Sequence, residues 1–263
     1  MGAAVSGVTL VTGGARRLGR AMVLELARRG HDVAIHYDRS AEDAEATAAE
    51  ARALGVAAAT FQADLLDADA TAALVGRVAD RMGRLEVLVN NASIFDHDTI
   101  HSATMDGWDR HLGSNLRAPF QLIQAFAAQA PKACPDENGE PQARALVINM
   151  VDQRVLKPTP AFMTYSIAKA ALWSLTRTAA QALAPDIRVN AIGPGPTMQG
   201  SRQSAAHFAA QRAGTILERG ADPQGITQAL GYFLEARAVT GQLICVDGGQ
   251  HLGWRTPDII GHD

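Results

Sequence analysis

Short apolar runs alternate with longer amphipathic stretches along the whole chain. The runs typical of strands are Val8–Thr12, Asp32–Tyr37, Ala57–Gln62, Val87–Asn90, Ala145–Met150, Arg188–Ile192 and Gln242–Val246. The stretches typical of helices are Leu18–Arg29, Ala41–Leu54, Ala70–Met82, Trp108–Ala130, Tyr165–Leu183 and Pro223–Leu234. Because the strand runs are apolar at nearly every position, we expect both faces of their sheet to be covered. The alternation therefore predicts an α/β fold, a single doubly wound parallel seven-stranded sheet with helices on both faces.

Two segments interrupt this rhythm. Pro131–Gln142 is polar and rich in proline, which is typical of a surface excursion. Gly193–Gly220 follows the sixth strand, at the sheet edge where ligands bind in such folds, so it is a candidate substrate lid; the alternative is a plain surface loop with a short helix. Neither segment changes the composition, so residues 1–263 are interpreted as one domain. Whether residues 251–263 cover the pocket or a neighbouring subunit is left open.

The composition narrows the class of protein. Hydrophobic residues make up 47% of the chain and charged residues 19%, as in a protein with a large core. The formal net charge of −3 argues against nucleic acid or a membrane surface as partner. No apolar run reaches the roughly 20 residues of a membrane span, and no secretory signal pattern precedes the first strand. Cys134 and Cys245 lack metal-ligand spacing, so we expect free thiols, no metal and a cytoplasmic location.

The turn after the first strand carries the first candidate chemistry. Residues 12–19 read TGGARRLG and lead directly into a helix. Glycine lets the backbone approach a pyrophosphate, and the start of a helix presents unpaired N–H groups to its charge. Two arginines in the turn add positive charge. We therefore predict a dinucleotide site of the Rossmann type, with Gly13, Arg16, Arg17 and Leu18 contacting the cofactor.

The end of the second strand distinguishes the two nicotinamide cofactors. An acid there binds the ribose 2′-hydroxyl, whereas an arginine accommodates a 2′-phosphate. This segment reads HYDRS, residues 36–40. Asp38 would suit a ribose, but Arg39 and Ser40, with Tyr37 beside them and Arg16 from the glycine turn, can surround a phosphate. The pattern favours NADPH; the alternative is that Asp38 and Arg39 form a solvated turn.

A tyrosine and a lysine supply the candidate acid–base chemistry. Tyr165 and Lys169 lie four residues apart at the start of a predicted helix, so they share one face. A nearby ammonium lowers the pKa of a tyrosine, which can then exchange a proton while a nicotinamide exchanges hydride. A Tyr-x-x-x-Lys pair is common in proteins, and most such pairs lie on an exposed helix face without a catalytic role. Its context decides.

In order and spacing, the motifs resemble the short-chain dehydrogenase/reductase family. They are TGGARRLG at 12–19, NNAS at 90–93, Asn115, YSIAK at 165–169 and PGPT at 194–197. The resemblance implies that Tyr165 is the acid/base, that Lys169 binds the nicotinamide ribose, and that Asn115 supports a water relay. It also implies a homo-oligomer, most simply a homotetramer. The other cofactor contacts that it and the strand ends imply are Asp64, Leu65, Asn91, Ala92, Ser93, Pro194 and Gly195.

The departures from the common family pattern are specific. Arg17 stands where glycine is usual, Ser93 also replaces a glycine, and Asp152 replaces the serine that orients a carbonyl. A carboxylate is a poor donor to a carbonyl, which argues against plain ketone chemistry. These changes are similar to those of the pteridine reductase branch, and Phe95 in NNASIF matches an aromatic that sandwiches a pterin against the nicotinamide. The alternatives are a core aromatic at Phe95 and a polar loop residue at Asp152.

We therefore predict NADPH-dependent reduction of a dihydropterin or dihydrofolate-like ring. Catalysis would use Tyr165, Lys169, Asp152 and Asn115, and the substrate would contact Arg17, Ser93, Phe95, Asp152 and Tyr165. Two alternatives stay open: a general NADP(H)-dependent carbonyl or alcohol oxidoreductase, and a dinucleotide-binding protein without turnover. A dinucleotide-binding protein without turnover would not need Asn115, Tyr165 and Lys169, and all three are present.

Overall fold

The computed structural model describes residues 7–200 and 203–254. The ends of the predicted 1–263 domain, two residues of the candidate lid (201–202) and most of segment 251–263 lie outside the described residues.

Seven strands form one sheet, as predicted. They are β1 (Val8–Val11), β2 (Val33–Tyr37), β3 (Ala58–Gln62), β4 (Leu85–Asn90), β7 (Ala145–Met150), β8 (Ile187–Pro194) and β9 (Leu243–Val246). The order across the sheet is β3-β2-β1-β4-β7-β8-β9, and all neighbouring strands are parallel. The chain moves outward from β1 to β3 and then crosses to β4 on the other side of β1. The carboxyl ends of β1 and β4 therefore flank the crevice where doubly wound sheets bind ligands.

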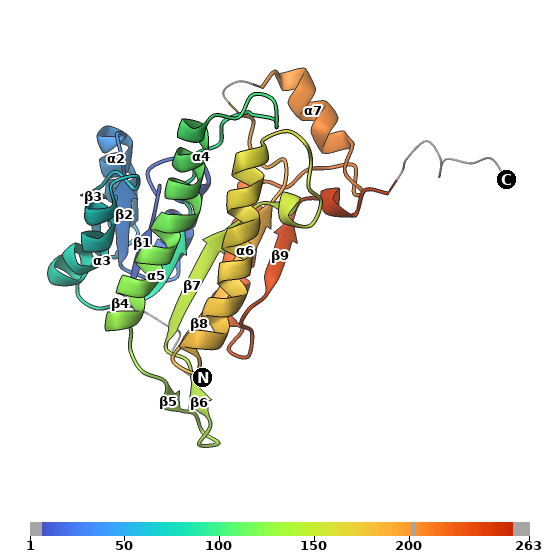
Figure 1. Cartoon of the computed structure of the whole chain (residues 1–263). Helices are drawn as coiled ribbons and strands as arrows, with labels where there is room; N and C mark the ends of the chain where they lie inside the picture. The colour runs from blue at the N-terminus through green and yellow to red at the C-terminus, as the bar shows by residue number, and fades with distance from the viewer. Residues whose placement is uncertain (1–6, 201–202, 255–263) are drawn as a thin grey trace.

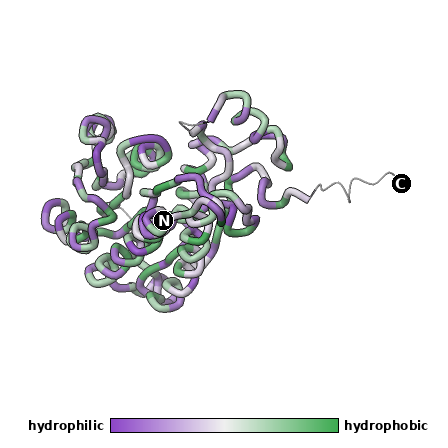
Figure 2. The backbone as a smooth tube through the Cα atoms, turned by 45° about the horizontal axis from the view of Figure 1, so that its top comes forward, coloured by the Kyte–Doolittle hydropathy of each residue, from purple (hydrophilic) through white to green (hydrophobic). Residues whose placement is uncertain are grey.

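Helices cover both faces of the sheet, which confirms the predicted layers (Figure 1). The helices α1 (Arg17–Arg28), α2 (Ala41–Ala53) and α8 (Pro223–Glu235) pack on one face. The helices α3 (Ala68–Met82), α5 (Ala118–Gln129) and α6 (Met163–Leu183) pack on the other. Each layer has its own apolar core, with Met22, Leu26 and Phe233 on the first face and Leu74, Leu122 and Phe126 on the second. Along the helical coils hydrophobic and hydrophilic residues alternate, as amphipathic packing requires (Figure 2).

The long helix predicted over Trp108–Ala130 is divided in the structure. It begins earlier, as α4 (Met105–Leu112), widens into a π-helical turn, η1 (Gly113–Arg117), and continues as α5. The stretch stays helical on both sides of the wider turn, so the sequence pattern does not reveal it. Asn115 lies in this turn, and π-helical turns often occur at functional sites.

Each of the two irregular segments contains a short element, and the lid role of Gly193–Gly220 stays a prediction. Pro131–Gln142 contains a small hairpin of β5 (Cys134–Pro135) and β6 (Pro141–Gln142) away from the main sheet. The candidate lid contains α7 (Ala205–Ala213). Short 3-10 turns, η2 (Gln153–Val155) and η3 (Gln250–Leu252), follow β7 and β9. Both cysteines are free, and across residues 7–200 and 203–254 none of the helices combines the length and apolar character of a membrane span.

Candidate active site

The glycine turn after β1 fits a bound anion. Gly13 has a φ of 60°, and a Cβ built on it would lie 3.1 Å from the Ala92 Cα. A Cβ on Gly19 would lie 2.0 Å from the Gly13 carbonyl oxygen, so both positions require glycine. Arg16 does not cap α1 with its side chain, and the first turn of that helix, which the structure describes in full, holds no acidic residue. Its N–H groups and positive dipole end are therefore available to a pyrophosphate.

Two polar side chains hold this turn in place. The Gly13 N–H donates to His36 Nδ1 (3.0 Å), and the His36 Nε2 lies 3.0 Å from the Ala63 carbonyl oxygen. The Asn91 side-chain amide donates to the carbonyl oxygens of Thr12 (2.9 Å) and Gly13 (3.1 Å). Burial lowers the pKa of His36, which favours the neutral ring that this pattern needs. The role of His36 was missed from the sequence, where it is one position of an apolar strand.

The predicted phosphate-binding arginines each pair with an acid near the junction of β2 and α2. Arg16 Nε is 3.6 Å from Asp43 in the first turn of α2, and Ser40 immediately precedes that helix. Arg39 Nε is 3.3 Å from the Asp38 carboxylate, and its side chain is 89% exposed. Such exposed pairs contribute about 0–1 kcal/mol, so both guanidinium groups can turn toward a phosphate. The Arg39 guanidinium offsets the charge of Asp38. This pairing favours a 2′-phosphate at this edge more than an unpaired acid would.

The other predicted cofactor residues lie at the end of a strand or just after one, at the same rim. These are Tyr37, Asp64, Leu65, Ala92, Ser93, Pro194 and Gly195. Leu65 is buried in the core, whereas Asp64 and Ser93 are exposed. The Gly195 N–H donates to the Val246 carbonyl oxygen (3.0 Å), and a Cβ on Gly195 would lie 2.5 Å from the Asp247 side chain. Glycine is therefore required where this loop passes β9.

Asp152 and Tyr165 form a direct pair. The Tyr165 hydroxyl donates to Asp152 Oδ2 (3.0 Å), and Tyr165 is only 6% exposed. Arg154 holds the carboxylate from the other side, because its backbone N–H donates to Oδ1 (2.8 Å) and its Nη1 donates to Oδ2 (3.2 Å). Asp152 is thus an acceptor for the tyrosine and not a donor to a carbonyl. The Asp152 carboxylate also caps the turn η2 through the Arg154 N–H, so it has a structural contact as well as the contact with Tyr165.

The electrostatics of Tyr165 differ from the expectation. The pKa of its hydroxyl is raised well above the ordinary value, first by burial and then by the charge and hydrogen bond of Asp152; the opposing influence is Arg154. The prediction from the Tyr-x-x-x-Lys spacing was a lowered pKa, and the direction is the opposite, with Arg154 as the cation that opposes the rise. The Lys169 ammonium lies 5.7 Å from the tyrosine ring and donates to the Met150 carbonyl oxygen (2.7 Å). Burial lowers the lysine's own pKa to about 8.

Phe95 is an exposed aromatic beside the tyrosine, so it is not a core residue. It is 45% exposed, and its ring lies edge-on to Tyr165 with centroids 4.7 Å apart. One of its faces stacks on Phe162 at 4.3 Å and 2°. The Arg154 guanidinium lies 5.6 Å from the centre of the Phe95 ring and 5.1 Å from that of Phe162. Aromatic surface, a cation and the proton-bearing pair therefore meet at one place.

Asn115 is buried in the π-helical turn and binds the chain just before Phe95. Its Oδ1 accepts the Ile94 N–H and its Nδ2 donates to the Ile94 carbonyl oxygen, both at 2.9 Å. It is completely inaccessible to solvent. The observed role of Asn115 is to hold this loop, and the water relay implied by the family resemblance stays a prediction.

Arg17 joins the glycine turn to the candidate lid. It has a φ of 53°, unusual for a residue with a side chain. Its guanidinium donates to the carbonyl oxygens of Gln199 (2.9 Å) and Met198 (3.2 Å). The lid is also tied to itself, because Arg212 donates to the Pro196 carbonyl oxygen (2.9 Å). Arg17 therefore stands between the predicted pyrophosphate site and the segment that would cover the substrate.

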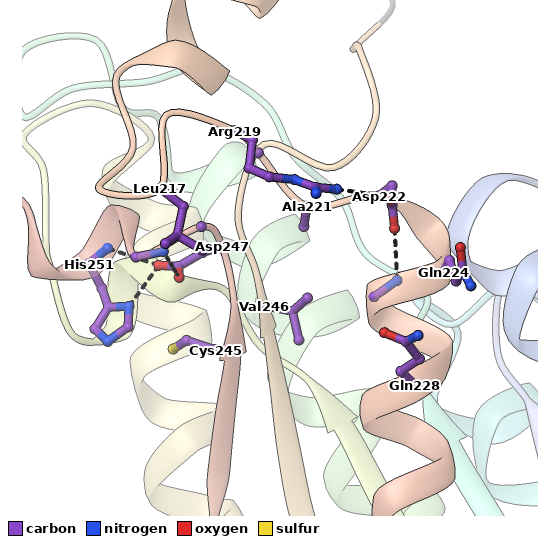
Figure 3. Close-up of a pocket in the computed structure, with 14 residues that line it drawn as sticks. Leu217, Arg219, Ala221, Asp222, Gln224, Gln228, Cys245, Val246, Asp247 and His251 are labelled. Carbon is purple, nitrogen blue, oxygen red and sulfur yellow. Dashed lines mark hydrogen bonds and ion pairs between the residues drawn. The ribbon is translucent and has the colours of Figure 1, made fainter.

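A separate hollow of about 500 Å³ lies between the end of β9, segment 217–222 and the start of α8 (Figure 3). Its polar groups bind one another. Asp247 accepts from the His251 backbone N–H (2.8 Å) and lies 2.7 Å from its ring, while Asp222 caps α8 through Gly225 (2.8 Å). The lining of this hollow, which the structure describes, includes none of the predicted catalytic residues.

Besides the role of His36, sequence reasoning missed Arg154 and Phe162. Both lie outside the motifs that signal the chemistry. A charged residue two positions after Asp152 is a usable signal, because the acid would otherwise lack a counter-charge in a partly buried loop. Phe162 has a φ of 56°, and nothing in the sequence around it indicates that conformation.

Comparison with known proteins gives relatives of two kinds. The family model described as short chain dehydrogenase matches residues 7–209. The crystal structure of FolM alternative dihydrofolate reductase 1 from Brucella canis complexed with NADP superimposes with a TM-score of 0.89, at 44% identity, covering 97% of this chain and 98% of that one. Pteridine reductase 1 of Leishmania tarentolae is 32% identical over 93% of this chain and 96% of its own length. The 3-oxoacyl-(acyl-carrier-protein) reductase FabG of Staphylococcus aureus (strain Mu50 / ATCC 700699) is 32% identical over 92% and 97%.

Proposed function

Since the chain belongs to the short-chain dehydrogenase family, we propose that it is an NADPH-dependent reductase whose substrate is a dihydropterin or dihydrofolate-like ring. Support for the cofactor comes from the anion-accepting glycine turn with Arg16, from Arg39 after β2, and from the NADP complex of the similar FolM structure. When bound, NADPH supplies the hydride.

One observation carries the choice of substrate: the Tyr165 hydroxyl is hydrogen-bonded to a carboxylate, Asp152. An ionised carboxylate cannot donate to a substrate carbonyl, but it can accept N–H groups. An amino-substituted ring presents such N–H donors. The pair therefore suits a C=N substrate in an amino-substituted heterocycle better than a simple ketone.

Tyr165 would deliver the proton. As hydride reaches the ring carbon, the adjacent nitrogen gains a lone pair and needs a proton, and the tyrosine hydroxyl is the buried donor nearby. Its raised pKa keeps that proton in place at neutral pH. Asp152 and Arg154 orient the hydroxyl, and Lys169 would contact the nicotinamide ribose.

The exposed Phe95 would provide the surface on which a flat ring stacks. Its 45% exposure leaves apolar area uncovered beside Tyr165, and aromatic contacts of this kind contribute about 0.5–1.5 kcal/mol beyond area burial. Ser93 is exposed two residues earlier and would accept from the ring's amino group. Arg17, whose guanidinium donates to the Gln199 and Met198 carbonyl oxygens, would close over the substrate together with the Gly193–Gly220 segment.

A second candidate is reduction of a 3-oxoacyl thioester, because FabG is similar to this chain over nearly its whole length. Against it stands Asp152, at the position where a hydroxyl donor would be needed. Asp152→Ser is therefore expected to raise turnover of small ketones and to lower turnover of dihydropterins.

The test is an assay of NADPH consumption at about 340 nm, the absorbance of the reduced nicotinamide. Purified protein is offered dihydrobiopterin, dihydromonapterin, dihydrofolate and an acetoacetyl thioester, with Tyr165→Phe as the control. We expect oxidation of NADPH with at least one dihydropterin or dihydrofolate, lost by about 100-fold or more in the control. Turnover of the thioester alone would replace this function with the second candidate, and binding of NADPH without turnover of any substrate would favour a non-catalytic protein.

We also propose a homotetramer in a reducing, cytoplasmic setting. Support for assembly comes from apolar side chains exposed on the helix layer that holds α5 and α6, including Phe120 (45%) and Ile167 (41%). Support for the setting comes from the two free cysteines.

A further inference from the structure

A chain of buried polar side chains joins the loop after β4 to the start of α6. The Thr164 hydroxyl donates to one oxygen of the Asp98 carboxylate, and the Thr164 N–H donates to the other at 3.2 Å. His111 Nδ1, from α4, lies 2.7 Å from Thr164 Oγ1. The Asp96 N–H donates to His111 Nε2 at 3.1 Å. Asp98, Thr164 and His111 are 7%, 3% and 1% exposed, so these bonds do not compete with water.

The partners leave one hydrogen arrangement for the histidine. Because the single hydroxyl hydrogen of Thr164 goes to Asp98, its oxygen must accept from His111 Nδ1–H. Because Nε2 accepts the Asp96 N–H, that nitrogen carries no hydrogen. The ring is therefore neutral and protonated on Nδ1, and each of its nitrogens binds a different segment of the chain.

The loop at residues 95–98 also caps α6, the helix that carries Tyr165 and Lys169. Phe162, the residue before α6, has a left-handed conformation and no capping side-chain bond. Asp98 replaces the missing cap, since its carboxylate accepts the Thr164 N–H and its carbonyl oxygen accepts the Phe162 N–H at 2.8 Å. A carboxylate at this end also complements the helix dipole. The start of α6 thus depends on the loop at 95–98.

These contacts lie one residue away from the two rings of the proposed site. Phe95 precedes Asp96, and Tyr165 follows Thr164. The Phe95 and Tyr165 rings are 4.7 Å apart at 75°, and the His111 ring lies 6.2 Å from that of Tyr165 at 73°. His111 is therefore hydrogen-bonded to the residue next to each ring, and its own ring also lies against the Tyr165 ring.

We propose that His111 is a positioning residue, which fixes the stacking ring of Phe95 and the proton donor Tyr165 at one mutual distance and angle. The proposal rests on the proposed function. It assigns the two nitrogens different effects: the bond to the Asp96 N–H positions the ring that binds substrate, and the bond to Thr164 positions the hydroxyl that protonates it.

Two conservative variants separate these effects. Asn can place a donor near the position of Nδ1, and Gln can place an acceptor near that of Nε2. We expect His111→Asn to raise KM for the dihydropterin about tenfold, the equivalent of one lost buried hydrogen bond, with little change in kcat. We expect His111→Gln to lower kcat by about the same factor with little change in KM. His111→Leu should show both losses, and His101→Asn, an exposed histidine of the preceding loop, should show neither.

Thermal unfolding of each variant, and crystal structures of wild type and His111→Leu, complete the test. We expect the 95–98 loop of the leucine variant to be displaced relative to α6. Parallel losses in kcat and KM that follow only the loss of stability, or a loop that stays in place in the leucine variant, would overturn the positioning role. The structural comparison needs no turnover. If the wild type reduces no dihydropterin, the proposed function is refuted, while the structural comparison still tests the positioning role of His111.

Discussion

At the scale of single residues, the groups around the Tyr165 hydroxyl decide what chemistry it performs. The hydroxyl faces Asp152, which carries a negative charge, while the expected cation, Lys169, binds the Met150 carbonyl oxygen instead. The sequence motif therefore predicts which residues gather but not which of them controls the proton. That control depends on burial and on Arg154, neither of which the spacing contains.

Replacing Asp152 should shift the pH dependence of reduction. Asp152 raises the pKa of Tyr165, so Asp152→Asn lowers it by removing the charge. Reduction needs a protonated Tyr165, and the variant should therefore lose activity at a lower pH on the alkaline side than wild type does. The measurement is kcat/KM against pH, with Asp80→Asn, an exposed acid on α3, as the matched control. An alkaline limb that stays in place or moves upward would contradict the assignment.

We expect buried Lys169 to lower the stability of the protein when no cofactor is bound. Its pKa falls from 10.5 to about 8 in the folded chain, so between these values the unfolded chain holds a proton that the folded chain has lost. Stability from this group is therefore lowest below pH 8 and recovers as the pH rises toward 10.5. We expect Lys169→Met to raise the free energy of unfolding at neutral pH by about 2 kcal/mol, after the lost hydrogen bond is allowed for, and to abolish turnover. Urea unfolding at about pH 7 and pH 10 tests this, and a less stable variant at neutral pH would count against it.

At the scale of elements, hydrophobic period predicts the strands and most helices well, because those patterns reflect burial against the sheet. It fails where local geometry departs from a regular period. The π-helical turn at Gly113–Arg117 interrupts a stretch that is helical on both sides, and Phe162, just before α6, has a left-handed conformation. Both departures occur beside the candidate site, and both are fixed by contacts from distant segments, through Ile94 and Asp98.

The close contact between the glycine turn and α1 gives an element-scale prediction. A methyl group at Gly19 would meet the Gly13 carbonyl oxygen at 2.0 Å, so Gly19→Ala must push the helix away from the turn. We expect NADPH affinity to fall at least tenfold, about 1.4 kcal/mol, as measured by isothermal titration calorimetry. Gly76→Ala is the control, since a Cβ there meets no atom within 4 Å and alanine favours the interior of α3. Equal affinity of both variants would show that the turn does not hold the cofactor.

At the scale of the whole molecule, the order of strands brings the candidate residues that lie at strand ends to one rim. The glycine turn after β1, the Asn91–Phe95 segment after β4 and Asp152 after β7 are separated in the sequence but follow neighbouring strands. This arrangement was predictable, because the carboxyl ends of parallel strands share an edge. The Arg17 contact with the lid was not, since it joins segments that no local pattern relates.

Assembly is the second property at this scale. If the exposed apolar side chains of the α5 and α6 layer are interfaces, light scattering coupled to gel filtration should give about four times the 27.7 kDa mass of one chain. Phe120→Glu places a charge in that layer and should reduce the mass, whereas a wild-type mass of a single chain would exclude the tetramer.

The most direct measurement is a crystal structure of the protein with oxidised NADP and a dihydropterin. We expect the ring to lie between Phe95 and the nicotinamide, with the Tyr165 hydroxyl in hydrogen-bond distance of the nitrogen that is protonated. A ring bound elsewhere, or a nicotinamide whose reactive carbon lies out of reach of this hydroxyl, would contradict the account.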